Sequence, residues 1–360
     1  MEQFLCPTRI IAGSGAMTAL KELNIKRLFL VCDPFFAKNG AAEALIRRAG
    51  GPESRVFSEV VPDPPVTLAA KGAAQIKEFC PDAVVALGGG SAMDAAKAMR
   101  YFSGVPALLV AIPTTSGSGS EVTDFAILTH GGVKHPLVDE KLKPEIAIVD
   151  SDLVASLPQA LVAEGGFDLI SHAIEAYVAT GRSCFSDMLA EAALKTALDE
   201  LLPSYEGDPG SREKMHTAAT MAGMAFSQAG LGLCHAISHS LGGEFHLPHG
   251  RLNAILLPAV MEQNALHCGA RYGALARAVG LSGSSELMAQ RALKNALIRL
   301  RRSLQLPQTL AQAGICPAAL SEKLDTLTEA ALADPCCGGN PAQPTAETVR
   351  SILLQVMGRG

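Results

Sequence analysis

Four histidines lie close together in an almost uncharged stretch, "GLGLCHAISHSLGGEFHLPHG", which spans residues 230–250. His235 and His239 are four residues apart, so on one helix their imidazoles would share a face. The chain must turn at Pro248, which allows His249 to return toward the same point. An isolated buried histidine is usually a hydrogen-bonded core residue, but this concentration of imidazoles favours a metal site.

An upstream segment, "GGFDLISHAIEAY", repeats this spacing with Asp168 and His172 in a helical, mostly apolar context. A second helix face therefore offers one carboxylate and one imidazole. Imidazoles with a single carboxylate suit Fe(II), Zn(II), Co(II) or Mn(II), and no suitably placed cysteine adds a thiolate. The two segments together predict a site for one divalent metal, and residue types alone leave open which histidines bind it.

Two turns rich in glycine and hydroxyl groups predict a nucleotide site. In "LGGGSAMDAAK" an apolar run ends in Gly88, Gly89 and Gly90, whose backbone N–H groups can approach an anion closely. Ser91 and Asp94 follow at capping-box spacing, so we expect them to start a helix whose N-terminus points at a pyrophosphate. An ordinary tight turn between a strand and a helix is the alternative interpretation of this segment.

The second turn, "PTTSGSGSEVT", covers residues 113–123 and offers hydroxyls for phosphate and ribose oxygens at Thr114, Thr115, Ser116 and Ser118. Its presence makes a nucleotide the better interpretation of both turns. Asp33 ends a third apolar run, where its carboxylate would bind a ribose diol and repel a 2′-phosphate, which favours NAD over NADP. A simple turn residue before Pro34 is nearly as good an interpretation on local grounds.

The elements that must position these motifs differ between the two halves of the chain. Short apolar runs alternate with helical stretches at residues 26–33, 82–90, 105–115 and 145–150. Such runs are typical of a parallel sheet buried on both faces, and ligands bind beyond the carboxyl ends of its strands. After about Leu157, Ala, Leu and Glu recur at helical spacing. We therefore predict an α/β domain with a Rossmann-like parallel sheet over residues 1–157 and an all-α domain over residues 158–360.

Composition excludes several classes of protein. The length of 360 residues and the 48% hydrophobic content suit two domains with buried cores. A net charge of −5 without a basic run argues against nucleic acid as a partner. The nearly uncharged segment 217–243 contains Gln228, His235 and His239, which argue for a buried helical core and against a membrane span.

The termini and the cysteines complete this interpretation. The opening "MEQFLCPTRIIAG" shows no signal-peptide pattern, so we expect a cytoplasmic protein. The nine cysteines are odd in number and scattered, which fits reduced thiols. We expect "CCGGNPAQP", near the C-terminus, to form an exposed loop.

The motifs resemble those of the iron-containing, group III alcohol dehydrogenase family over essentially the whole chain. "GGGSAMDAAK", "PTTSGSGSEVT", "GGFDLISHAIEAY" and "GLGLCHAISHSLGGEFHLPHG" occur in the family's order and approximate spacing. Within the family, "GMAFSQAGLGL", "FHLPHG" and the short chain resemble the propanol and ethanol dehydrogenases of bacterial microcompartments. The resemblance implies the two-domain fold shared with dehydroquinate synthase.

The resemblance also implies site residues. A divalent metal, Fe(II) in preference to Zn(II), would be held by Asp168, His172, His235 and His249. His239 would lie close to the substrate but outside the metal shell, and His246 matches no ligand position. NAD(H) contacts carry over to Asp33, Gly89, Gly90, Ser91, Asp94, Thr114, Thr115, Ser118 and Lys134.

The activity implied is NAD(H)-dependent interconversion of short-chain primary alcohols and aldehydes, such as 1-propanol and propanal or ethanol and acetaldehyde, which would recycle NADH to NAD. We expect His239, or a water that it orients, to relay the hydroxyl proton. The family suggests a homodimer. A microcompartment is an alternative location, with its shell or aldehyde-producing enzymes as partners.

Three other functions are compatible with parts of this pattern. A polyol dehydrogenase of the glycerol or 1,3-propanediol type would share the domain plan. A dehydroquinate-synthase-like lyase needs several Lys and Arg residues to grip its substrate, whereas the metal motifs supply only Arg251. A non-enzymatic metal or nucleotide sensor would bind NADH without turnover.

Overall fold

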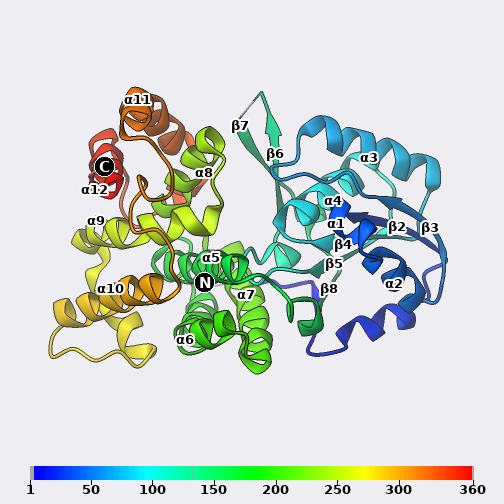
Figure 1. Ribbon diagram of the computed structural model, residues 1–360, viewed down its shortest axis with the longest axis horizontal. Coiled ribbons are helices and arrows are strands. Elements are labelled where there is room, and N and C mark those ends of the chain that lie inside the picture. Colours follow the sequence, from blue (N-terminus) through cyan, green and yellow to red (C-terminus); the bar gives the residue numbers. More distant parts are fainter. Residues whose placement is uncertain (1–3, 132, 359–360) are drawn as a thin grey trace. The chain divides into compact units, whose positions relative to one another are not determined.

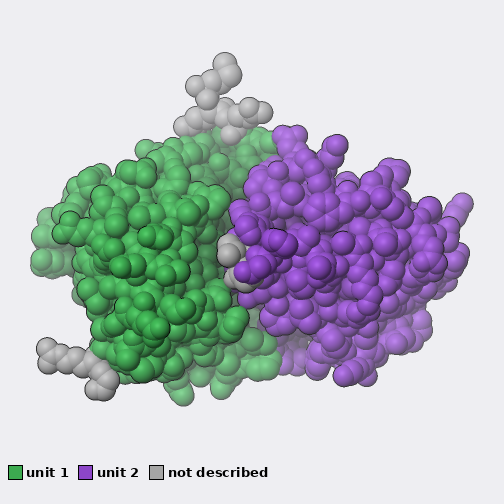
Figure 2. Space-filling view, turned by 90° about the horizontal axis from the view of Figure 1, so that it is seen from above, with its two compact units in different colours: residues 1–5, 158–360 green, residues 6–157 purple. Residues whose placement is uncertain are grey.

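The computed structural model describes residues 4–131 and 133–358. The chain forms two compact units, one of Cys6–Leu157 and the other of Pro158–Gly360 with Met1–Leu5, coloured separately in Figure 2. The first three residues of the N-terminal stretch, and Gly132 in the segment that carries Lys134, lie outside the described residues. Each unit is described by itself.

The unit Cys6–Leu157 is built on a six-stranded sheet in which every pairing is parallel. Its strand order is β1-β8-β5-β4-β2-β3, with bounds β1 Arg9–Ala12, β8 Ile146–Val149, β5 Leu108–Pro113, β4 Ala83–Gly88, β2 Arg27–Cys32 and β3 Glu53–Phe57. The four apolar runs are the four inner strands, which confirms the predicted sheet. The edge strands β1 and β3 were not predicted, because most of their side chains are exposed and the strands form no apolar run.

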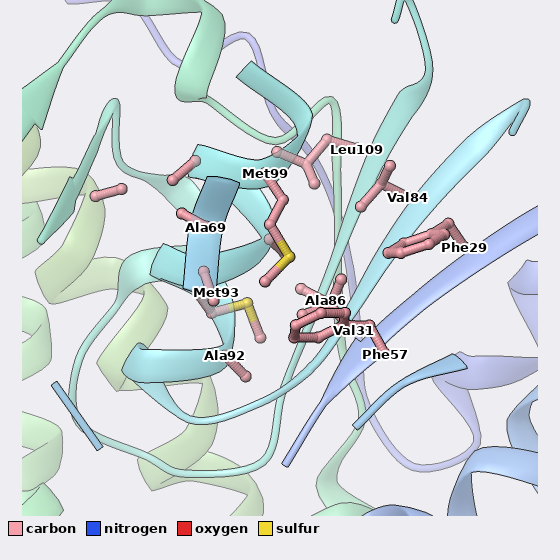
Figure 3. Packing of buried hydrophobic residues seen from close by; sticks show 14 of the residues in the cluster. Phe29, Val31, Phe57, Ala69, Val84, Ala86, Ala92, Met93, Met99 and Leu109 are labelled. Carbon is pink, nitrogen blue, oxygen red and sulfur yellow. The ribbon is translucent and has the colours of Figure 1, made fainter. Parts of the chain in front are cut away.

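Helices cover both faces of this sheet (Figure 1). Alternate residues of β2 show why, since Phe29 and Val31 belong to one core cluster and Leu28 and Leu30 to another. The first cluster packs against α3 and α4, and the second against η1 and α2, whose bounds are α3 Val66–Phe79, α4 Gly90–Ser103, η1 Ala16–Leu23 and α2 Ala41–Arg48. Figure 3 shows Met99 of α4 within the first cluster.

Smaller elements complete the unit. They are α1 Pro34–Lys38, η2 Ser120–Val122, η3 Glu140–Leu142, η4 Ser151–Leu153 and an antiparallel hairpin of β6 Phe125–His130 with β7 Val133–Val138. The hairpin was not predicted. Lys97, only 1% exposed, donates to Ser120 Oγ at 3.1 Å, Thr123 Oγ1 at 2.8 Å and the carbonyl of Phe125 at 2.9 Å. This lysine therefore fastens the start of the hairpin to α4.

The other unit is helical, and the described residues after Pro158 contain no strand. Its elements are α5 Gln159–Val178, α6 Cys184–Glu206, α7 Pro209–Ala229, α8 Leu233–Phe245, α9 His249–Ala278, α10 Glu286–Ser303, α11 Pro317–Ala333, η5 Pro335–Gly339 and α12 Ala346–Met357. Helix α5 packs against α6, α7 and α9, while α8 packs against α9 and α11. The α/β half followed by an all-α half agrees with the predicted fold class.

Two further expectations can be compared with this unit. The uncharged segment 217–243 is divided between two helices, because α7 ends at Ala229 and α8 begins at Leu233. Among residues 4–131 and 133–358, no helix has the length and apolar character that crossing a membrane requires. All nine cysteines are free thiols.

The expectation of an exposed loop at "CCGGNPAQP" was wrong. Cys337 is buried in η5, and the Asn340 side chain is only 4% exposed. Asn340 exchanges two hydrogen bonds with the amide of Asn264 and accepts the backbone N–H of Leu233 at 3.2 Å. The polar Asn340 of this segment is buried because it forms hydrogen bonds with other buried groups, and composition alone does not reveal such partners.

Candidate active site

Helices α5 and α8 bring three of the predicted ligands together. Asp168 and His172 lie one turn apart on α5, and His235 lies near the start of α8. One donor atom from each of these side chains lies within 4.8 Å of the other two. The imidazoles of His172 and His235 stack with their centroids 4.5 Å apart, and His172 also stacks on Phe226 of α7. The two helices therefore converge at these three side chains, as the sequence predicted.

His249 is close to this cluster but is not one of the three grouped donors. It is the first residue of α9, directly after Pro248, and its ring centroid is 5.0 Å from that of His239. The adjacent Gly250 explains how α9 reaches α5, because a Cβ at this position would lie 1.8 Å from the carbonyl oxygen of Glu164. The role of His249 as a fourth ligand stays a prediction.

Two polar residues that were not predicted hold the predicted ligands in place. Glu175 hydrogen-bonds through Oε2 to Nδ1 of His235, while its Oε1 accepts the backbone N–H of Cys234 at 2.7 Å. Asn253 of α9 donates from Nδ2 to Asp168 Oδ1 at 2.9 Å. Glu175 follows Asp168 by seven residues on α5, so helical spacing gave a usable indication of it. Nothing local indicated Asn253.

The charges of this cluster suit a cation. Burial alone would raise the pKa of the Asp168 carboxyl, but His172, His235 and His249 hold it well below its usual range. Burial lowers the pKa of His235, whereas Glu175 and Asp168 outweigh this and raise it to about 9. A carboxylate and two imidazoles in an electron-rich, buried setting fit a divalent metal, which would take the place of the proton on His235.

His239 sits one turn beyond His235 and has a different partner. Its Nδ1 is 2.8 Å from Oδ2 of Asp334, and its ring centroid is 6.1 Å from that of His235. Burial opposes ionisation of Asp334, but the hydrogen bond from His239 holds the pKa of that carboxyl below its ordinary value. His246, which ends α8 in the left-handed conformation, is exposed. Asp334 was not among the predicted site residues.

In the α/β unit, the carboxyl ends of neighbouring strands bring the predicted nucleotide turns together. Gly88 of β4 pairs with Pro113 of β5, and the N–H of Thr114 donates to the carbonyl of Gly88 at 3.0 Å. The two turns then run in close contact. A Cβ on Gly89 would lie 3.3 Å from Thr115 Oγ1, and one on Gly90 would lie 3.4 Å from the Cβ of Ser118. These glycines therefore permit a close approach of the turns.

The capping box predicted for Ser91 and Asp94 was wrong. Gly89 is the N-cap of α4, so Ser91 lies inside the helix. Asp94 instead accepts a hydrogen bond from Ser120 Oγ at 3.1 Å, which joins α4 to the second turn. Burial raises the pKa of Asp94 to about 6, although Lys97 opposes this shift. Asp94 therefore bonds to the distant Ser120 and not to the start of its own helix, where Gly89 is the N-cap without a side-chain hydrogen bond.

The two remaining predicted nucleotide residues have structural partners of their own. Asp33 caps α1, with its Oδ1 accepting the N–H groups of Phe35 at 2.8 Å and Phe36 at 3.3 Å. Its Oδ2 lies 4.0 Å from the position of a Cβ on Gly88, beside the glycine turn. Asp33 therefore has a local structural role as the N-cap of α1, and its Oδ2 accepts no hydrogen bond from the residues that the structure describes. Lys134 of β7 forms an ion pair with Asp63, with Nζ and Oδ1 2.6 Å apart.

Comparisons with known proteins cover both units. The chain matches the family "Iron-containing alcohol dehydrogenase" at residues 7–151 and "Fe-containing alcohol dehydrogenase family, C-terminal" at residues 162–357. It is 40% identical over 371 residues to the 1-propanol dehydrogenase PduQ of Salmonella typhimurium, covering 99% of this chain and 100% of the relative. It is 38% identical over 377 residues to an NADPH-dependent butanol dehydrogenase of Clostridium saccharobutylicum, covering 98% and 97%. The solved iron-containing alcohol dehydrogenase of Thermococcus thioreducens superposes with a TM-score of 0.90 at 33% identity, covering 98% of this chain and 99% of that one.

Proposed function

The chain belongs to the iron-containing alcohol dehydrogenase family, and from this premise we propose that Asp168, His172, His235 and His249 hold its catalytic divalent metal. The protein is an NAD(H)-dependent, metal-dependent alcohol dehydrogenase. The observation that carries the ligand assignment is the convergence of donor atoms from Asp168, His172 and His235. Fe(II) is the expected metal, and Zn(II) is the alternative that the same donors accept.

The reaction converts a primary alcohol and NAD⁺ to an aldehyde, NADH and a proton. A metal held by Asp168, His172, His235 and His249 would supply a Lewis acid for the substrate oxygen, and a bound nicotinamide would supply or accept the hydride. We assign acceptance of the hydroxyl proton to His239, directly at Nε2 or through one water. The neighbouring imidazoles outweigh burial and lower the pKa of Asp168, which favours its ionised form as a metal ligand.

The α/β unit is assigned to cofactor binding. The close contact of Gly89 with Thr115 and of Gly90 with Ser118 supports a single cradle for the pyrophosphate. The free oxygen of Asp33 is suited to the adenosine ribose diol and favours NAD over NADP. Ser91, Thr114 and the hydroxyl of Ser118 would contact phosphate or ribose oxygens. Asp94 supports this cradle through its hydrogen bond with Ser120, and Lys134, which pairs with Asp63, remains a proposed contact of the nucleotide.

As substrates we propose 1-propanol and propanal or ethanol and acetaldehyde, with aldehyde reduction recycling NADH to NAD. The full-length similarity to a 1-propanol dehydrogenase supports this choice. The polyol alternative is tested with the same assay, by comparing propanal, acetaldehyde and butanal with glycerol and dihydroxyacetone. Higher kcat/KM for the polyols would overturn the proposed substrate class.

The test of metal dependence is anaerobic purification with metal analysis, followed by NADH oxidation with propanal in the presence and absence of added iron or zinc. We expect about one metal per chain and activity that chelation removes and iron restores. Full activity after complete chelation would contradict the ligand assignment.

We further propose a cytoplasmic homodimer that can reside within a bacterial microcompartment, with the shell or an aldehyde-producing enzyme as a neighbour. Resemblance to the microcompartment-associated propanol dehydrogenases supports this location. Sedimentation analysis tests the dimer, and enrichment of the protein in purified compartments tests the location.

A further inference from the structure

A carboxylate from the C-terminal part of the chain reaches the histidine assigned to proton transfer. Asp334 is 95 residues from His239 in sequence, yet Oδ2 of the former lies 2.8 Å from Nδ1 of the latter. The two side chains are only 15% and 13% exposed. A hydrogen bond between a carboxylate and an imidazole is strong in such a shielded place, because little water competes for either group.

Asp334 is held firmly by its own surroundings. Its Oδ1 caps η5 by accepting the backbone N–H of Cys336 at 2.8 Å, and its backbone N–H donates to the carbonyl of Ala331 at 3.2 Å. The helices on either side are also tied together, because Ser240 Oγ of α8 donates to the carbonyl of Leu327 in α11 at 2.9 Å. The carboxylate therefore has one oxygen fixed by backbone and the other directed at His239.

This arrangement decides where the proton on His239 resides. An ionised carboxylate can only accept, so Nδ1 must carry the hydrogen, and in the neutral imidazole Nε2 then carries the lone pair. The ring of His239 lies beside those of His235 and His249, with centroid separations of 6.1 Å and 5.0 Å. The basic nitrogen thus belongs to an imidazole at the edge of the ligand cluster.

We infer that Asp334 is the positioning residue that fixes the tautomer and ring orientation of His239 for proton transfer. In alcohol oxidation Nε2 takes the hydroxyl proton while the hydride goes to NAD⁺, and the Nδ1–H bond to Asp334 stays intact. In aldehyde reduction Nε2 returns that proton to the oxygen. The inference rests on the proposed function, which supplies the reaction in which His239 acts.

The same side chains with Cys336 also resemble a small metal site, since one donor atom of each lies within 4.8 Å of the others. Both oxygens of Asp334 are already engaged in hydrogen bonds, which favours the positioning role. Metal analysis separates the two interpretations. One metal per chain in both wild type and Asp334→Asn supports positioning, and loss of a second metal from the variant overturns it.

The kinetic test uses Asp334→Asn, because asparagine is also a good N-cap and should preserve η5. We expect kcat for propanal reduction to fall about 10- to 100-fold. This loss is no larger than the usual rate contribution of a general acid or base, because His239 itself remains in the variant. The KM for propanal should stay within about twofold, since the proton relay acts after binding. Asp208→Asn is the matched control, because Asp208 caps α7 through the N–H of Ser211 at 2.7 Å and is not part of the ligand cluster.

A double-mutant cycle shows whether Asp334 acts through His239. In the His239→Ala background, Asp334→Asn should have almost no further effect on kcat. An undiminished effect there would give Asp334 an independent role and overturn the inference, as would a wild-type kcat in Asp334→Asn itself. Asp334→Glu should recover part of the lost rate by restoring a charged acceptor.

The tautomer of His239 can be measured by NMR without turnover, so this test does not depend on the proposed function. In protein labelled with ¹⁵N-histidine, the signals of His239 are identified by their loss in His239→Ala. We expect the Nδ1–H tautomer in wild type and a shift toward the other tautomer in Asp334→Asn. No change in tautomer would overturn the inference even if the enzyme is active, whereas an inactive wild type with the expected tautomers would contradict only the proposed function.

Discussion

Glu175 and His235 form a buried carboxylate–imidazole pair that joins α5 to the start of α8. The same carboxylate accepts the N–H of Cys234, so it is fixed from the backbone as well. With Nδ1 engaged by Glu175, His235 presents Nε2 toward Asp168, 3.7 Å from its Oδ1. A partner of this kind orients a metal-binding histidine and makes it a better ligand.

Replacing Glu175 with Gln should therefore weaken metal binding about 10- to 100-fold. The amide removes the negative charge while nearly preserving the volume. Competition with a metal chelator measures the affinity, and Glu206→Gln, at an exposed position of α6, is the control. An unchanged affinity would show that the pair does not support the ligand.

Alanine variants should separate ligands from the proton relay. His235→Ala and Asp168→Ala are expected to lose most of the bound metal, because each removes one of the three converging donors. His239→Ala should keep wild-type metal content but turn over more slowly, by roughly 10²- to 10⁴-fold. Metal analysis beside steady-state kinetics tests both. Loss of metal from His239→Ala would make His239 a ligand, and full occupancy in His249→Ala would remove His249 from the ligand set.

Asp33→Ser should change the cofactor preference without loosening α1. Serine can still cap the helix through the N–H groups that Asp33 now binds, but it carries no charge to repel a 2′-phosphate. We expect the ratio of kcat/KM for NADPH to that for NADH to rise at least about tenfold, with Tm close to wild type. Asp33→Ala should also shift the ratio, at an additional stability cost of about 1 kcal/mol. An unaltered ratio in both variants would exclude Asp33 from cofactor selection.

Gly250→Ala should force α9 away from α5. The added Cβ would lie 1.8 Å from the backbone oxygen of Glu164, and backbone cannot give way as a flexible side chain can. We expect a loss of about 1–3 kcal/mol in unfolding free energy together with lower metal content, because His249 and Asp168 lie on the displaced helices. Denaturant unfolding and metal analysis measure the two effects. Gly210→Ala is the control, since its Cβ would meet nothing closer than the side chain of Asp208 at 3.4 Å.

The buried Asp94 should make the free energy of unfolding depend on pH. Its pKa is raised from 3.8 to about 6, so the folded protein holds this proton more tightly than the unfolded chain. The resulting stabilisation is present below a pH of about 4 and is lost as pH rises through about 6. Relative to Asp94→Asn, the unfolding free energy of the metal-free wild type should fall across this window by up to about 3 kcal/mol. Denaturant titrations at intervals from pH 4 to 7 check this, and a difference that does not vary with pH would contradict it.

The local sequence pattern was sufficient to predict the inner strands, the shared helix face of two site residues and the first glycine turn. The apolar runs around Val31, Val85 and Val110 became inner strands because a strand covered on both faces needs an unbroken apolar sequence. The four-residue spacing of Asp168 and His172 placed both on one face of α5 because helical geometry repeats nearly every four residues. Gly88 likewise marked the end of β4, since its φ of +155° favours glycine and a Cβ there would lie 2.6 Å from the Cβ of Ala92.

The tertiary structure decided which side chains meet across these elements. Asp334 reaches His239 only because α8 packs against α11, and Asn253 reaches Asp168 only because Gly250 lets α9 touch α5. The same applies to Asp94, which found Ser120 instead of the helix start that its spacing indicated. The sequence by itself therefore determined the four inner strands, the helical half, the shared helix face of Asp168 and His172 and the two turns that follow β4 and β5, because these depend on neighbours a few residues away. The partners that orient those groups depended on contacts between distant segments, which only the packed chain brings together.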